Sequence, residues 1–174
     1  MGCEGSPPIS RPRSPGFVPP KKPTGLRVLL YKFPVYLYRM GLGFLFGGRF
    51  LLLTHRGRKT GKIYHTLLEV IRYDQEKDES IVVAAYGEKA SWYQNIRKTP
   101  ALEVRMRGKR YVPEQRFLSP EEVYREFSTY EKKYPRLTRI LIRILGAKYD
   151  GSEEGRRRLA RFIRMVAFRP KAPS

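Results

Sequence analysis

Cysteine and histidine are nearly missing from this chain of 174 residues, which limits the chemistry open to it. Cys3 is the only cysteine, so no internal disulfide can form and nothing favours a secreted protein. His55 and His65 are the only histidines, which argues against a Cys/His zinc site and leaves few bases to activate a nucleophile. We therefore expect no metal site. Redox or group-transfer chemistry would depend on a bound organic cofactor.

Long hydrophobic runs are also missing. The longest uncharged stretch of the apolar N-terminal region runs from Met40 to Gly48, about half of the ~20 residues that a membrane span requires. The chain begins with polar and proline-rich residues rather than with the apolar core of a signal peptide. We therefore expect a cytoplasmic protein.

Acidic residues are scarce and unevenly placed. The chain has 36 Lys and Arg against 16 Asp and Glu, a formal net charge of +20, and no acidic residue lies between Glu4 and Glu69. Such an excess of positive charge predicts an anionic partner, which can be nucleic acid, an anionic membrane surface or a phosphorylated cofactor. Charge alone leaves these three open. Because the basic residues are spread over tail, loop and helices without a nucleic-acid-binding motif, we expect no nucleic acid.

Composition divides the chain into a tail, a helical segment and one domain. Residues 1–24 are rich in Pro, Ser, Gly and basic residues and predict a disordered tail. Residues 25–48 have the spacing of an amphipathic helix, which Pro34 would kink or break. This segment either packs on the domain or lies on a membrane interface, at the inner face of the plasma membrane. Residues 49–170 are expected to form the folded domain, and 171–174 a short tail.

The domain is predicted to be α+β and mainly β. Runs rich in β-branched, aromatic or leucine residues predict strands, and capped amphipathic runs predict helices. The expected strands are 49–55, 64–73, 80–86, 101–107, 110–118 and 164–169. The expected helices are 91–98, a helix that starts at Ser119, a helix that starts at Pro135, and 152–161. In the helix that starts at Pro135, the side chains expected to point inward are Leu137, Ile140, Leu141, Ile144 and Leu145. This order indicates a small antiparallel barrel with helices packed at one side.

A basic loop with two glycines, Thr54–Lys62, separates the first two expected strands. The glycines allow backbone N–H groups to approach an anion closely, and Thr60 adds a hydroxyl. Arg58, Lys59 and Lys62 supply positive charge. The segment is either an anion-binding loop or an ordinary solvated hairpin, and composition does not separate the two. The spacing of a Walker A motif is absent.

Two aromatic groups follow. Trp92, the only tryptophan, lies beside Tyr93 and Asn95, and an aromatic pair beside an amide can wall a planar ring and bind its edge. The alternative is ordinary core packing of Trp92. Tyr130 and Tyr134 lie at the junction of two expected helices, where they can line a pocket and donate a proton or simply belong to the core.

The order of these motifs resembles the deazaflavin-dependent nitroreductase family, also called the F420-dependent quinone reductase-like family. The motifs are T-x-x-G-R-K-T-G within Leu52–Gly61, A-A-x-G within Val82–Gly87, W-Y-x-N-I and a proline within Trp92–Pro100, and a V-x-V-type strand at Leu102–Arg105. The resemblance covers about residues 45–170. It implies a split β-barrel, similar to that of FMN-binding proteins, which binds coenzyme F420, a deazaflavin with a phosphate and an oligoglutamate tail.

The resemblance also implies roles for particular residues. By position, Arg58, Lys59 and Thr60 would hold the phosphate region of the cofactor. Tyr134, which would face the substrate, and Tyr130 are the candidate catalytic residues. The remaining cofactor-binding positions would be Tyr64, His65, Thr66, Leu67, Leu68, Ala84, Ala85, Tyr86, Gly87, Trp92, Tyr93 and Asn95.

The implied reaction is hydride transfer from the reduced deazaflavin to an electron-poor small molecule such as a quinone, enone or nitroaromatic. The protein would align the reactants and stabilise developing negative charge, while a tyrosine or water delivers a proton. Related split barrels use FMN, so an FMN-dependent oxidoreductase on the same fold is the main alternative. Another is a non-catalytic lipid-binding or membrane-surface protein that uses residues 25–48. The sequence does not determine the oligomeric state.

Overall fold

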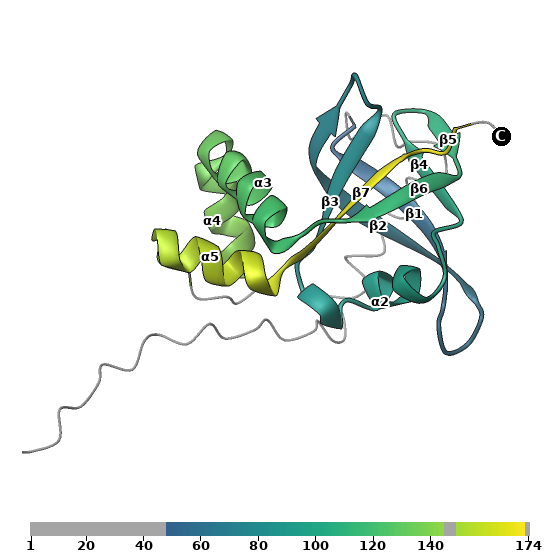
Figure 1. Ribbon diagram of the computed structural model, residues 1–174, viewed down its shortest axis with the longest axis horizontal. Helices are drawn as coiled ribbons and strands as arrows, with labels where there is room; N and C mark the ends of the chain where they lie inside the picture. Colours follow the sequence, from purple (N-terminus) through teal and green to yellow (C-terminus); the bar gives the residue numbers. More distant parts are fainter. Residues whose placement is uncertain (1–47, 145–148, 173–174) are drawn as a thin grey trace, which may run out of the picture.

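The computed structural model describes residues 48–144 and 149–172 (Figure 1). The predicted tail 1–24 and the predicted helix 25–48, except for its last residue, lie outside the described residues. The described ranges contain one sheet and four α-helices. None of these helices is both long enough and apolar enough to cross a membrane.

Seven strands, all paired antiparallel, form the sheet. They are β1 Phe50–Arg56, β2 Ile63–Asp74, β3 Glu79–Ala84, β4 Glu103–Met106, β5 Lys109–Tyr111, β6 Pro113–Phe117 and β7 Arg164–Pro170. Their order is β5-β4-β1-β2-β3-β7-β6, so the two edge strands, β5 and β6, are neighbours in the sequence. Because only Val112 separates them, the two edges must approach each other and the sheet nearly closes. The domain is the predicted split β-barrel.

The expected strand 110–118 is in fact two strands, divided before Pro113. β5 pairs with β4 whereas β6 pairs with β7, so the chain changes partner at this point. Proline has no N–H to donate and is therefore tolerated where pairing begins. The Gln115 side chain accepts a hydrogen bond from the Ala101 N–H at 2.9 Å and donates to the Ile96 carbonyl at 2.9 Å. These bonds join β6 to α2 and to the segment between α2 and β4.

The four α-helices are α2 Ser91–Lys98, α3 Pro120–Lys133, α4 Pro135–Ile144 and α5 Glu153–Phe162. Figure 1 shows α2 at one end of the barrel and the other three gathered at one side. The predicted start of α3 is confirmed: the Ser119 hydroxyl accepts the Glu122 N–H, and the Glu122 carboxylate accepts the Ser119 N–H at 2.8 Å. This capping box satisfies two backbone donors that a helix start leaves open.

β7 connects the barrel to the helices. Val166 and Phe168 lie in the barrel core, whereas Met165 and Ala167 pack with residues of α3 and α5. Successive side chains of a strand point to opposite faces, so one strand contributes to both cores. The helices are thereby held against the outside of the barrel.

The expected buried face of α4 is wrong at Ile140, and the side chains of Ile144 and Leu145 lie outside the described residues. Thr138 and Ile142 are the buried side chains, while Ile140, expected to point inward, is 53% exposed and Leu137 and Leu141 are half-buried. Residues 138 and 142 are four apart and share one face of the helix. The helix therefore turns a less apolar face toward α3 than its sequence pattern indicates.

Candidate cofactor site

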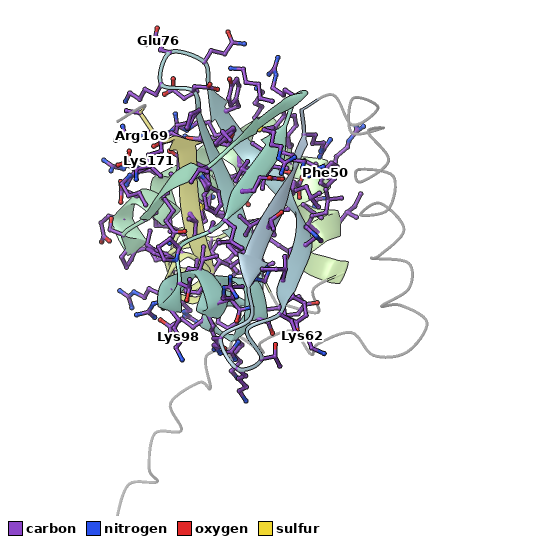
Figure 2. All side chains as sticks on the ribbon, turned by 90° about the vertical axis from the view of Figure 1, so that its right-hand side faces the viewer. Phe50, Lys62, Glu76, Lys98, Arg169 and Lys171 are labelled. Atoms are coloured by element: carbon purple, nitrogen blue, oxygen red, sulfur yellow. The ribbon has the colours of Figure 1, made fainter. Side chains whose placement is uncertain are left out.

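The loop between β1 and β2 extends from the same end of the barrel as α2. Figure 2 shows Lys62 of this loop and Lys98, the last residue of α2, at that end. The loop is closed by two backbone hydrogen bonds, from the Gly61 N–H to the Gly57 carbonyl and from the Gly57 N–H to the Lys62 carbonyl, each 2.8 Å long. A Cβ at residue 57 would lie 2.5 Å from the Tyr64 ring, so only glycine allows this close approach.

Asn95 of α2 joins the loop to the barrel. The backbone N–H and the guanidinium Nη1 of Arg58 donate to Asn95 Oδ1 at 3.1 and 3.0 Å. The other amide atom, Nδ2, lies 3.2 Å from His55 Nδ1 and donates to it. Asn95 is buried, and these contacts occupy both of its polar atoms. The amide thus positions the Arg58 side chain and the start of the loop at once.

His55 is held in its neutral form. It is 2% exposed, and burial lowers the pKa of its imidazole to about 4. Since Nδ1 accepts from Asn95, the proton lies on Nε2, which donates to the Thr66 hydroxyl at 3.0 Å. The imidazole also stacks on the Tyr64 ring, with the centroids 6.0 Å apart. The first positions of β2 are therefore tied to the last positions of β1 by side chains as well as by the strand pairing.

A groove of about 950 Å³ runs from this loop along β2, the end of β3 and α2. Its basic end holds Arg58 and Lys59, and its apolar wall includes Leu67, Val83 and Trp92. The sequence-predicted residues that line it are Arg58, Lys59, Thr60, Tyr64, His65, Thr66, Leu67, Leu68, Ala85, Tyr86, Trp92 and Asn95.

Three predicted site residues lie outside the groove lining. Ala84 is fully buried in the barrel core, because the alternation of β3 turns its neighbours Val83 and Ala85 toward the groove instead. Tyr93 is buried and packs edge-on against Phe117. The remaining residue is Gly87, where a Cβ would lie 2.2 Å from the carbonyl oxygen of Phe162.

The groove also contains residues that the sequence analysis did not select: His55, Gly57, Glu69, Val83, Ala90 and Ser91. Strand alternation could have identified Val83, since it follows from the positions of its neighbours. No local pattern indicates His55 or Glu69. Their positions depend on the pairing of β1 with β2 and on where α2 and α3 pack.

A family model, described as F420H(2)-dependent quinone reductase, matches residues 37–143. The chain belongs to this family. It is an oxidoreductase that uses coenzyme F420. An F420-H2-dependent reductase of known structure is 21% identical, with 69% of this chain and 93% of that chain covered and a TM-score of 0.46. A pyridoxamine 5'-phosphate oxidase-related, FMN-binding protein from Nostoc punctiforme is 12% identical, with 80% of each chain covered and a TM-score of 0.47. No curated protein sequence matches the chain.

The groove of this F420H(2)-dependent quinone reductase family member fits its cofactor in size and in chemistry. Its volume is of the order of the pockets that hold large organic ligands. Arg58 and Lys59, which line the groove, form no ion pair with a described residue, which leaves their charges available to a phosphate and carboxylates. The apolar wall suits the face of a planar ring.

A second cavity, of about 490 Å³, shares one wall residue with the groove. That residue is Glu69, whose carboxylate accepts the Tyr130 hydroxyl at 2.9 Å and an Arg49 N–H at 3.2 Å. Burial, reinforced by the Glu69 charge, raises the pKa of Tyr130 to about 12. The Tyr134 ring lies 5.2 Å from that of Tyr130 and is 40% exposed. The structure therefore places both candidate catalytic tyrosines beside this cavity, next to the groove.

Proposed function

We propose that this F420-dependent oxidoreductase transfers a hydride from the reduced cofactor to an electron-poor small molecule, with quinones as the first class to test and enones and nitroaromatics as further classes. The observation that carries the proposal is a groove in which a loop with unpaired cations continues into an apolar wall. Reduced F420, when bound, supplies the hydride. A quinone that takes up one hydride and one proton becomes a hydroquinone.

The loop end of the groove binds the anionic part of the cofactor. Arg58 offers a planar guanidinium that matches a phosphate, and Asn95 holds this side chain in place. Lys59 and Thr60 add a mobile charge and a hydroxyl beside it. Because the binding groups are organised before the ligand arrives, less conformational entropy is lost on binding.

The apolar part of the groove orients the ring and excludes water. Leu67, Ala85 and Trp92 line this region. A site that keeps water away strengthens the electrostatic interactions within it and protects a reactive hydride donor. Tyr134 is the residue we propose to deliver the proton, because its side chain is exposed whereas the Tyr130 proton is held by Glu69.

The test is a fluorescence titration of the purified full chain with F420 and, in parallel, with FMN. Loss of F420 binding in Arg58→Ala/Lys59→Ala is the expected result, on the order of a hundredfold, because each charge-assisted contact contributes about 1.5–3 kcal/mol. The matched control is Lys77→Ala/Lys171→Ala, which removes the same charge from exposed positions outside the groove.

Three outcomes contradict the proposal. Equal loss in the control variant would show that net charge rather than the groove binds the cofactor. Binding of FMN alone would retain the fold and replace the cofactor. Tight binding of F420 without reduction of any quinone, enone or nitroaromatic would overturn the proposed reaction.

A further inference from the structure

Some unpaired cations of the described residues stand singly, such as Lys77 and Lys171, but one group of them lies away from the cofactor groove. On the barrel and on α5 most arginines are paired, as Arg169 is with Glu114 and Arg156 with Glu131. At the junction of α3 and α4 the pattern is different. The cations there that form no ion pair with a described residue are Lys132, Lys133, Arg136 and Arg139, and all four are exposed.

Apolar side chains lie among these cations. Ile140 is 53% exposed, and Leu137 and Leu141, which lie beside it on the helix surface, are half-buried. Ile140 is four residues from Arg136 and three from Leu137, so these side chains share a face of the helix. The opposite face, with Thr138 and Ile142, is the one that packs on the protein. We use the name α4 face for the exposed Arg136, Arg139 and Ile140 of α4, its half-buried Leu137 and Leu141, and the exposed Lys132 and Lys133 at the end of α3.

We propose that the α4 face is a docking surface for an anionic lipid membrane. An apolar centre with a basic margin is the arrangement of helices that lie in the plane of a membrane interface, where apolar side chains enter the acyl boundary and cations contact lipid phosphates. The charge is complementary to such a surface, since α4 begins with no acidic residue in its first turn. Tyr134, exposed at the start of the helix, is of the aromatic type that favours the interface.

A lipid surface explains the composition of the α4 face better than a nucleic acid does. Leucine and isoleucine side chains have no partner on a phosphate backbone, and the basic residues of nucleic-acid sites are usually accompanied by side chains that stack on bases or bind their edges. The location also matters. Figure 1 shows α4 with α3 and α5 at the side of the barrel, whereas the cationic loop of the cofactor groove projects from its end near α2. Membrane docking through α4 therefore does not require the residues that bind the cofactor.

The experiment is co-sedimentation of the full chain with vesicles of phosphatidylcholine and phosphatidylglycerol, compared with vesicles of phosphatidylcholine alone. We expect binding to the anionic vesicles only. Arg136→Gln/Arg139→Gln should weaken it about thirtyfold, since each basic residue near an anionic surface contributes about 1 kcal/mol. Ile140→Asp should weaken it about tenfold or more, because an apolar side chain is lost from the acyl boundary.

Each variant has a matched control. Lys77→Gln/Lys171→Gln removes the same charge from exposed positions away from α4, and Val112→Asp changes an exposed apolar residue, 59% exposed, between β5 and β6. Both controls should bind the vesicles as the unchanged protein does. F420 affinity, measured for every variant, should stay the same and so separate lipid docking from folding and from the cofactor site.

Several results would overturn the proposal. No sedimentation with anionic vesicles would do so directly. Equal weakening of vesicle binding in Lys77→Gln/Lys171→Gln would assign the binding to net charge. Unchanged vesicle binding by Ile140→Asp would show that apolar side chains of the α4 face do not contact the lipid. If a single-stranded RNA binds the α4 face instead, Arg136→Gln/Arg139→Gln weakens RNA binding while vesicles fail to bind.

Discussion

At the residue scale, the cofactor site depends on Asn95. One amide accepts two hydrogen bonds from Arg58 and donates one to His55, across 37 and 40 residues of sequence. Asn95 and His55 are not replaced easily, because both are polar and buried, and Arg58 depends on Asn95 for its position.

We expect Asn95→Ala to weaken F420 binding about tenfold and to lower the free energy of unfolding by about 1–3 kcal/mol. The variant leaves His55 Nδ1 without a donor and frees the Arg58 side chain. Fluorescence titration and urea unfolding measure the two effects. Gln94→Ala, on the same helix but not in the groove, is the control, and equal losses there would contradict the role of Asn95.

His55 makes stability depend on pH. The folded pKa of about 4 lies below the ordinary value of 6.5, so below pH 6.5 the unfolded chain binds a proton that the folded protein does not. The free energy of unfolding therefore falls as pH falls from 6.5 to about 4, by about 2 kcal/mol between pH 7 and pH 5. Urea unfolding at both pH values measures it. The free energy of unfolding of His55→Gln should fall less between pH 7 and pH 5. An equal fall would assign the pH dependence to other groups.

The two candidate catalytic tyrosines should differ in kinetics. Tyr134→Phe removes the proposed proton donor and should lower kcat on the order of a hundredfold, the usual contribution of general acid catalysis. Tyr130→Phe should have a smaller effect on kcat, because the Tyr130 hydroxyl already donates to Glu69 and the pKa of about 12 makes it a weak acid. Steady-state assays with one quinone compare the two, and a larger effect of Tyr130→Phe would reverse the assignment.

At the scale of elements, local signals mark most boundaries. The start of α3 depends on Ser119 and Glu122, and the division between β5 and β6 on Pro113. Such signals act over a few residues, and the start of α3 was therefore predicted without the fold. The division at Pro113 was not predicted, because a proline does not by itself show that the chain changes its pairing partner from β4 to β7. The orientation of α4 was not predicted, because the helix has more apolar residues than its packing on the domain buries.

Ser119→Ala should lower the free energy of unfolding by about 1 kcal/mol, since an uncapped helix start leaves backbone donors unsatisfied. Thermal unfolding measures the change as a lower midpoint temperature. Ser91→Ala is the control, because Ser91 is the first residue of α2 and no side chain caps that helix. A loss that is the same for both serines would show that the capping box adds no stability.

At the scale of the molecule, charge is divided among structural ion pairs, the cofactor groove and the α4 face. The groove and the α4 face hold cations without a described partner, so both should respond to salt. Among the described residues, the groove and the α4 face are therefore two separate surfaces that carry unpaired positive charge.

Raising the salt concentration from about 0.1 M to about 1 M should weaken F420 binding, because the screening length falls from about 10 Å to about 3 Å. Fluorescence titration at several salt concentrations measures the slope. Arg58→Ala/Lys59→Ala should show a shallower slope than the unchanged protein. An identical slope would mean that the loop charges do not contact the cofactor.

Residues near one another in the chain determined much of this protein: turns, caps and alternation predicted most strands and the helix starts, although 110–118 is two strands rather than one. The order of the motifs predicted the family and, through it, the split barrel. Turns, caps and strand alternation depend on interactions between residues that are close in the chain, and the order of the motifs can be seen in the sequence itself. Only the tertiary structure decided that Asn95 binds Arg58 and His55, that Ala84 faces the core while Val83 faces the groove, and that α4 leaves Ile140 exposed. Such contacts join residues far apart in sequence, so they exist only after the strands have paired and the helices have packed on the barrel.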